Sequence, residues 1–212
     1  MPSLGDTSIR NLSGLWVMDK TRSTNLDAVF SLQGLGWLTR KAIAASRVSL
    51  RITQGSDTDS DGLTGARSEW MVLEPVLTGS IKGAPEKRSL TWTESEHNDT
   101  LFGRVRICSH YIAGEKISDG RFRPLVELQT KIAESDVESM LIEAVAMAQE
   151  AETAEIVEKA FIHDYICSVD SGWTAEQIWA VEMIGEEKLL TRKIVVSKGS
   201  SIECARVYYR HE

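Results

Sequence analysis

The sequence predicts a mainly β protein whose strands form an up-and-down antiparallel sheet, interrupted by two helical regions. Short stretches of alternating apolar and polar residues recur along the chain and are bounded by glycine-rich or acidic turns. Two other stretches, one near the N-terminus and one in the middle, have helical spacing. Because the 212 residues show no internal repeat and no clean linker, we expect one domain over residues 1–212.

The first predicted strand, at residues 11–20, is followed by two short helices. Residues 23–27 offer helix-capping side chains, and apolar residues then recur at helical spacing as far as Leu32. Gly34 and Gly36 mark a tight turn, after which a second helix is expected at residues 37–45.

A meander of strands is predicted next. Alternation begins at Val48, and further strands are expected at residues 68–77, 88–93 and 101–112. The segment 96–99, a run of polar residues, is predicted to be a turn.

The polar loop at residues 55–65 matches the first half of a calcium-binding loop. It contains the pattern D-x-D-x-D-G, in Asp57, Asp59, Asp61 and Gly62. The position that needs a bidentate Glu is Ser68, and strands instead of helices flank the loop. A solvated turn is the preferred interpretation, with calcium binding as the alternative.

The pattern becomes helical after Arg123, most clearly at residues 137–161. Apolar residues form one stripe, and acidic residues occupy many of the remaining positions. We expect a helical insertion at about 123–161 that packs on the outer wall of the sheet or on a second copy in a homodimer. Strands then resume at residues 162–169, 175–184, 188–196 and 202–209.

Composition and charge exclude several classes of protein. Hydrophobic residues make up 42% and charged residues 26%, as in ordinary soluble proteins. The net charge is −7 and the basic residues are scattered, which argues against a nucleic acid partner. No apolar run approaches the roughly 18 residues that span a bilayer, so no membrane insertion is expected.

The cysteines indicate a reducing compartment. They are odd in number and far apart, at Cys108, Cys167 and Cys204, so a disulfide framework is not expected. Because no secretory signal is visible either, we expect a cytoplasmic protein. No ligand spacing for a transition metal and no phosphate-binding glycine loop is present, so neither a metal nor a cofactor is expected.

Three segments resemble fatty-acid-binding proteins and lipocalins of the calycin superfamily. Gly14-Leu15-Trp16 matches their opening G-x-W, and residues 26–41 look like the helix-turn-helix lid of fatty-acid-binding proteins. Arg206 and Tyr208 are similar to the R-x-Tyr strand with which that family grips a ligand carboxylate. The chain also resembles lipocalin-like fungal proteins associated with natural-product biosynthesis.

The resemblance implies a closed, calycin-like β-barrel with a two-helix lid and an apolar small molecule inside. About eight strands leave room for one such ligand, and short helices close the mouth. We expect the protein to act on this ligand as a cofactor-independent cyclase or isomerase of terpenoid or polyketide biosynthesis, for example a pericyclase performing a Diels-Alder reaction. The alternative is a non-catalytic carrier of a lipid or other hydrophobic ligand.

Eight residues are candidates for the site. Catalytic roles are assigned to a hydrogen-bonding pair on the last strand and a histidine: Arg206, Tyr208 and His163. Ligand contacts are assigned to aromatic residues and one basic residue of the lid: Trp37, Trp179, Tyr165, Tyr111 and Arg40. For each of them a core or surface position without a role in binding is the alternative.

Overall fold

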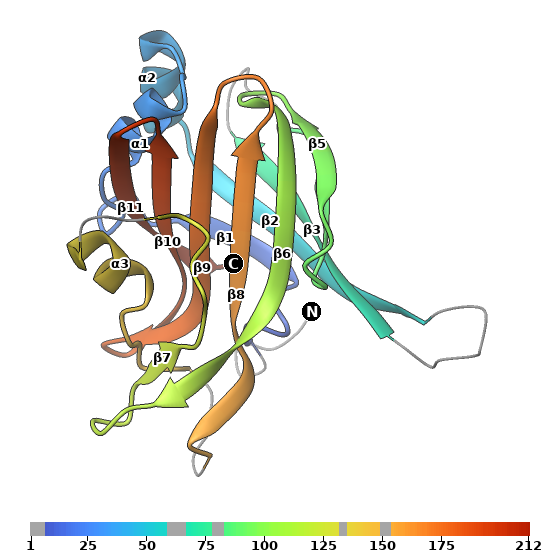
Figure 1. Ribbon diagram of the computed structural model, residues 1–212, viewed down its shortest axis with the longest axis vertical. Coiled ribbons are helices and arrows are strands. Elements are labelled where there is room, and N and C mark those ends of the chain that lie inside the picture. The colour runs from blue at the N-terminus through green and yellow to red at the C-terminus, as the bar shows by residue number, and fades with distance from the viewer. Residues whose placement is uncertain (1–6, 59–66, 78–82, 132–134, 149–153) are drawn as a thin grey trace.

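A computed structural model gives the fold (Figure 1) and describes residues 7–58, 67–77, 83–131, 135–148 and 154–212. The helices are α1 (Leu26–Leu32), α2 (Trp37–Ala45) and α3 (Ser135–Leu141). The strands before α3 are β1 (Gly14–Met18), β2 (Val48–Thr58), β3 (Arg67–Leu77), β4 (Glu86–Ser89), β5 (Ser95–Asp99), β6 (Gly103–Lys116) and β7 (Phe122–Pro124). The strands after it are β8 (Ile156–Ser168), β9 (Trp173–Ile184), β10 (Glu187–Lys198) and β11 (Ser201–His211).

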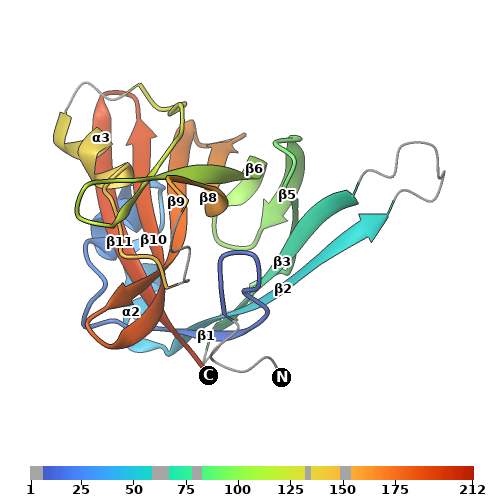
Figure 2. The ribbon, with the colours of Figure 1, turned by 90° about the horizontal axis from the view of Figure 1, so that it is seen from below.

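One antiparallel sheet contains all these strands, in the order β4-β3-β2-β1-β11-β10-β9-β8-β6-β5, and β7 pairs with β6. The sheet curls until its two ends approach each other, as Figure 2 shows from below. Just beyond β4, the backbone N–H of Trp92 donates to the backbone carbonyl of Ser109 on β6 at 2.8 Å. The predicted up-and-down antiparallel barrel is therefore confirmed, in the form of a curled half-barrel.

The two predicted lid helices are present as α1 and α2, and the turn between them contains Gly34 at φ 93°. This left-handed backbone conformation is the one that glycine adopts without strain. Helix α1 lies against β10 and β11 at one end of the barrel. The exposed polar run at Ser95–Asp99 is strand β5, not the predicted turn.

The helix predicted at 137–161 is wrong in the described residues after Leu141, which are 142–148 and 154–161. Helix α3 ends at Leu141, and Ile156 already begins β8. Between them, Val145 bridges Phe122 of β7, and Met147 bridges β9. The part of the apolar stripe that follows α3, around Val145, thus packs on the sheet in extended form, and these tertiary contacts override the weak helical preference of the sequence.

The central strands bury both faces. The inner row of β10, which includes Leu190 and Ile194, belongs to the core inside the barrel. Val195 on the outer row packs in a second core with Val145 and Leu141. Residues 122–131 and 135–148, which we call the strap, cover this outer face, with α3 beside β10 (Figure 1). Alternation of side chains along each strand makes this division possible.

Candidate functional site

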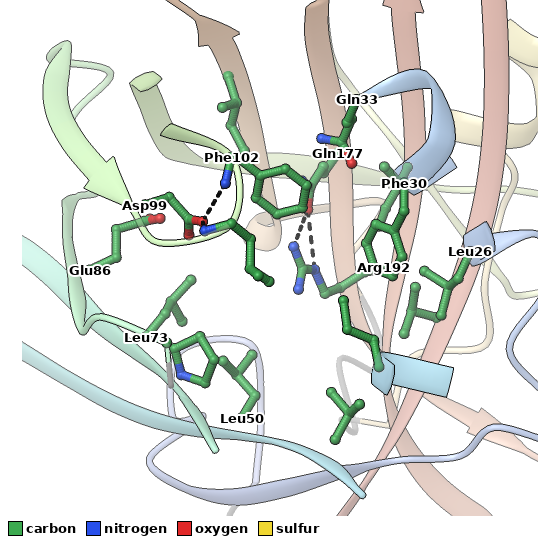
Figure 3. Close-up of a pocket in the computed structure, with 18 of the residues that line it drawn as sticks. Leu26, Phe30, Gln33, Leu50, Leu73, Glu86, Asp99, Phe102, Gln177 and Arg192 are labelled. Carbon is green, nitrogen blue, oxygen red and sulfur yellow. Dashed lines mark hydrogen bonds between the residues drawn. The ribbon is translucent and has the colours of Figure 1, made fainter. Parts of the chain in front are cut away.

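A cavity of about 220 Å³ lies inside the barrel beneath the lid helices. Figure 3 shows apolar side chains around it from α1, β2 and β3, among them Leu26, Phe30, Leu50 and Leu73. Phe30 of α1 also packs against Phe102, with ring centroids 6.1 Å apart, so the lid contacts the start of β6 across the cavity mouth. The cavity is therefore largely apolar and is closed on one side by the lid.

Arg192 of β10 is the most prominent polar group in this apolar wall. Its Nε and Nη2 donate to Oε1 of Gln177 at 3.1 and 2.5 Å, and its Nη1 donates to the Tyr209 hydroxyl at 3.4 Å. The guanidinium carbon lies 4.1 Å from the centroid of the Trp179 ring. Within the described chain, all of these partners are uncharged, so the guanidinium faces the cavity without a direct carboxylate partner.

Arg88 of β4 lies deeper in the wall, between two carboxylates. Its Nε contacts Glu86 and its Nη1 contacts Asp164, and its side chain is 5% exposed. Burial acts to lower the pKa of Arg88, but Asp164 and Glu86 outweigh it and raise that pKa above its ordinary value. Arg88 is therefore a permanently charged group that is already paired.

Asp164 connects the two arginines. Its carboxylate accepts from the Ser109 hydroxyl at 2.6 Å and from the Trp179 indole N–H at 2.7 Å. The same Trp179 ring supports the Arg192 guanidinium on its face. A continuous buried network thus runs from Arg88 through Asp164 and Trp179 to Arg192.

A further carboxylate lines the cavity at the end of β5. Oδ1 of Asp99 accepts from the backbone N–H groups of Leu101 and Phe102, at 2.7 and 2.9 Å. Figure 3 shows Asp99 and Glu86 on the side of the cavity that faces Arg192. The wall formed by β4 and the end of β5 therefore carries two carboxylates and the paired Arg88, and Arg192 lies on the opposite wall.

The predicted pair on the last strand faces outward. Along β11, Ala205, Val207 and Tyr209 are buried, and the last two line the cavity. Arg206 and Tyr208 share a face, as expected, but it is the outer one, where Arg206 pairs with Glu143 of the strap at 2.6 Å. A role of this pair in ligand binding stays a prediction, and the inward tyrosine is Tyr209.

His163 and Tyr165 also lie on the outer face, on β8. Nε2 of His163 is 2.7 Å from Oε1 of Glu176, and its Nδ1 is 3.2 Å from Nε2 of His110. Burial raises the pKa of the Tyr165 hydroxyl. A catalytic role for His163 stays a prediction, and the pocket that it would serve is not the cavity beneath the lid.

The remaining candidates are divided between the interior and the lid. Trp179 is fully buried beneath Arg192, and the hydroxyl of Tyr111 lies 3.2 Å from Nε2 of Gln54, near residues Ile9 and Leu12 that precede β1. Trp37 is 60% exposed on α2, and Arg40 pairs with Asp27 and lines a second hollow beside the lid. None of the eight candidates, all of which are described, lines the main cavity, so their ligand contacts stay predictions.

Sequence reasoning missed the residues that do line the cavity with polar groups: Gln33, Ser49, Glu86, Arg88, Asp99, Thr100, Gln177, Arg192 and Tyr209. One signal was available for Arg192. It interrupts the inward row of β10 between Leu190 and Ile194, and a charge on an apolar row indicates a function.

The calcium prediction falls mostly on residues 59–66, outside the described residues. Asp57 is described at the edge of that loop, where its Oδ1 accepts from the Trp70 indole at 2.9 Å. In the described ranges no group of three or more His, Cys, Asp or Glu residues is placed to hold a metal ion. Over the same ranges, no helix combines the length and apolar character needed to cross a membrane.

Comparison with known proteins gives matches to structures alone. No protein-family model and no curated protein sequence matches the chain. The wild-type fluorescent protein UnaG aligns at 12% identity over 95% of this chain and 97% of its own, with a TM-score of 0.50. The fatty-acid-binding protein of Manduca sexta aligns at 12% over 94% and 98% (TM-score 0.48), and human cRBP IV at 11% over 95% and 98% (TM-score 0.46).

At this level of identity the match to UnaG concerns the fold. The alignment covers nearly the whole of both chains. The predicted resemblance is therefore confirmed at the level of the fold, which this chain shares with UnaG.

Proposed function

We propose that the protein binds an apolar small molecule in the cavity beneath the lid, with one polar group of that molecule at Arg192. The observation that carries this proposal is the Arg192 guanidinium, which lines an apolar cavity and has only uncharged partners in the described part of the chain. Binding sites for apolar ligands commonly combine an apolar wall with a few fixed polar groups that orient the ligand.

The cavity is large enough for a small ligand, and a larger ligand requires the lid to move outward. Its volume of about 220 Å³ is below the roughly 300–1,000 Å³ of typical ligand pockets. Phe30 and Leu26 of α1 form part of the wall, so an outward shift of the lid enlarges the space without breaking a strand pair.

Native mass spectrometry and titration calorimetry with a panel of lipids, terpenoids and polyketides test this function. We expect at least one class to bind at a ratio of one to one. Replacement of Arg192 by Gln is expected to weaken that binding about tenfold or more, because a hydrogen bond to a charged group is lost. The matched control is Arg51→Gln, on the exposed face of β2, which is expected to bind like the wild type. Absence of binding by every class contradicts the proposal.

A cofactor-independent cyclase or isomerase of natural-product biosynthesis, including a pericyclase, is the second candidate. It is favoured by the hydrogen-bond donors of Arg192 and Tyr209 side by side in an apolar space. Such donors stabilise charge that develops on a carbonyl oxygen, while the wall holds a reactive chain in a folded conformation. The test is the product distribution of a reactive polyene with and without protein. If the rate and the stereochemistry are unchanged, the enzyme candidate fails and the carrier function remains.

A cytoplasmic location and a homodimer are further parts of the proposal. The three cysteines, all described and partly buried, form no disulfide bond with one another, which suits a reducing compartment. Cell fractionation tests the location. Size-exclusion chromatography with light scattering tests the homodimer, and a single species at the mass of one chain contradicts it.

A further inference from the structure

We propose that the ligand is uncharged: an apolar molecule whose carbonyl, ester, lactone or hydroxyl oxygen meets Arg192, and not a carboxylic acid. This inference rests on the proposed function of the cavity and names the class of ligand. It follows from the charges that the protein has already placed around the cavity and from the way in which Arg192 is held.

The first step concerns Arg88. Two carboxylates, Glu86 and Asp164, share this one guanidinium, and the side chains of all three are at most 12% exposed. One positive charge therefore stands against two negative charges in a place that water barely reaches. A buried excess charge is costly unless another charge nearby compensates it.

Arg192 supplies this compensation through an aromatic ring. Trp179 donates its indole N–H to Asp164 at 2.7 Å, and the Arg192 guanidinium carbon lies 4.1 Å from the centroid of the same ring. A single indole thus separates the positive charge of Arg192 from the negative charge of Asp164. Arg192 therefore has an electrostatic partner in Asp164, although none of the described carboxylates contacts it directly.

The count of charges then decides the ligand class. Among the described residues, the cavity wall and the groups bonded to it hold three carboxylates against two guanidinium groups: Glu86, Asp99 and Asp164 against Arg88 and Arg192. A ligand carboxylate adds a fourth negative charge to this low-dielectric space, whereas a neutral oxygen adds none.

The hydrogen bonds of Arg192 give an independent argument. A carboxylate gains most from a guanidinium when it accepts from two parallel N–H groups. In this protein Nε and Nη2 both already donate to Gln177, which occupies that edge of the fork. At the other end of the fork Nη1 already donates to the Tyr209 hydroxyl, so two of the five N–H groups remain, one on Nη1 and one on Nη2, and the two lone pairs of one neutral carbonyl oxygen satisfy them.

The test uses a matched series of probes with one hydrocarbon chain: dodecanoic acid, methyl dodecanoate, 2-dodecanone and 1-dodecanol. Their affinities for the full chain are measured by calorimetry at pH 7.5, below the micellar concentrations of the probes. We expect the best neutral probe to bind at least tenfold more tightly than the acid. An acid that binds as tightly as the neutral probes, or more tightly, overturns this inference while it leaves the proposed function standing. No binding by any probe overturns both.

A charge variant tests the physical cause. Glu86→Gln removes one negative charge from the wall, so we expect the acid to gain about tenfold in affinity relative to the neutral probes. Asp99→Asn is a second variant with the same expectation, should Glu86→Gln unfold more easily than the wild type. The matched control is Glu74→Gln on β3, an exposed carboxylate that pairs with Arg51, for which the ratio is expected to stay constant. An unchanged ratio in both folded wall variants overturns the inference.

Discussion

The inner and outer faces of strands β8 to β10 both bury charged side chains, but they treat them differently. On the outer face Glu176 is fully buried, and it accepts from His163 and from the backbone N–H groups of Gln129 and Thr130, at 2.7 to 2.8 Å. On the inner face Arg192 borders a cavity and has uncharged partners in the described chain. A buried polar group whose hydrogen bonds are all made and that lines no cavity indicates a structural role. A charged group that lines a cavity indicates ligand binding.

The largest effect is expected from the interior network, at Asp164. Asp164→Ala removes a partner of Arg88 and leaves that guanidinium with one carboxylate in a buried place. The variant also leaves the Ser109 hydroxyl and the Trp179 indole N–H without their acceptor, and each unsatisfied buried donor costs about 1–3 kcal/mol. Urea unfolding is expected to show a loss of this size, and Glu74→Ala at the exposed face of β3 is expected to unfold like the wild type. A stable Asp164→Ala variant contradicts the importance of the network.

A smaller loss is expected from the outer face, at Glu176. In Glu176→Gln, an amide group replaces a carboxylate oxygen that accepts a backbone N–H, so one donor is left without an acceptor. Such an unsatisfied buried group costs about 1–3 kcal/mol. Hydrogen exchange is expected to accelerate at residues 125–131, since the strap is anchored there.

Ligand affinity is the control that sharpens the comparison between the two faces. Glu176→Gln is expected to keep the affinity of the wild type for the best ligand, because Glu176 lies on the opposite face of β9 from Gln177 and the cavity. If the affinity falls together with the stability, the two faces are coupled and the division proposed here does not hold.

The division between the faces also explains what the sequence predicted and what it did not. Alternation placed Arg206 and Tyr208 on one face, but the same pattern fits either side of the sheet, and only the packing of Val207 and Tyr209 in the interior decides it. β5 was missed because its residues are polar throughout and give no apolar alternation.

The prediction for the middle of the chain failed for a different physical reason. Apolar groups keep their helical spacing after Leu141, yet Val145 and Met147 are in extended form and pack against the outer face of the sheet. The outer row of β10 also carries apolar residues, of which Leu189 and Val195 are fully buried. A second apolar face on a strand was therefore the available signal that something covers it.

Acid is expected to weaken the outer face through Glu176. Burial acts to raise the pKa of Glu176, but hydrogen bonds from His163 and from the backbone of Gln129 and Thr130 outweigh it and hold that pKa below its ordinary value of 4.5. A carboxylate with a lowered pKa in the folded state stabilises the protein above its unfolded pKa, and this contribution is lost as the pH falls through the folded pKa. Stability measured by urea unfolding is thus expected to fall below about pH 4.5, and the gap between wild type and Glu176→Gln is expected to narrow there. A gap that stays constant down to pH 3 contradicts this assignment.

The smallest effect is expected at Arg206, where the comparison between the faces is most direct. Its ion pair with Glu143 is half exposed, with 36% and 42% of the two side chains accessible, so water screens most of the attraction. Arg206→Ala is therefore expected to cost at most about 1 kcal/mol in urea unfolding. Arg206 lies on the opposite face of β11 from the cavity-lining Val207 and Tyr209, so ligand affinity is expected to stay within twofold of the wild type. Arg192→Gln on the neighbouring strand is expected to show the reverse, with affinity lost and the Glu143 pair untouched. If Arg206→Ala loses ligand affinity as Arg192→Gln does, a ligand binds on the outer face, and the arginine and tyrosine of the last strand, at positions 206 and 208, form the site.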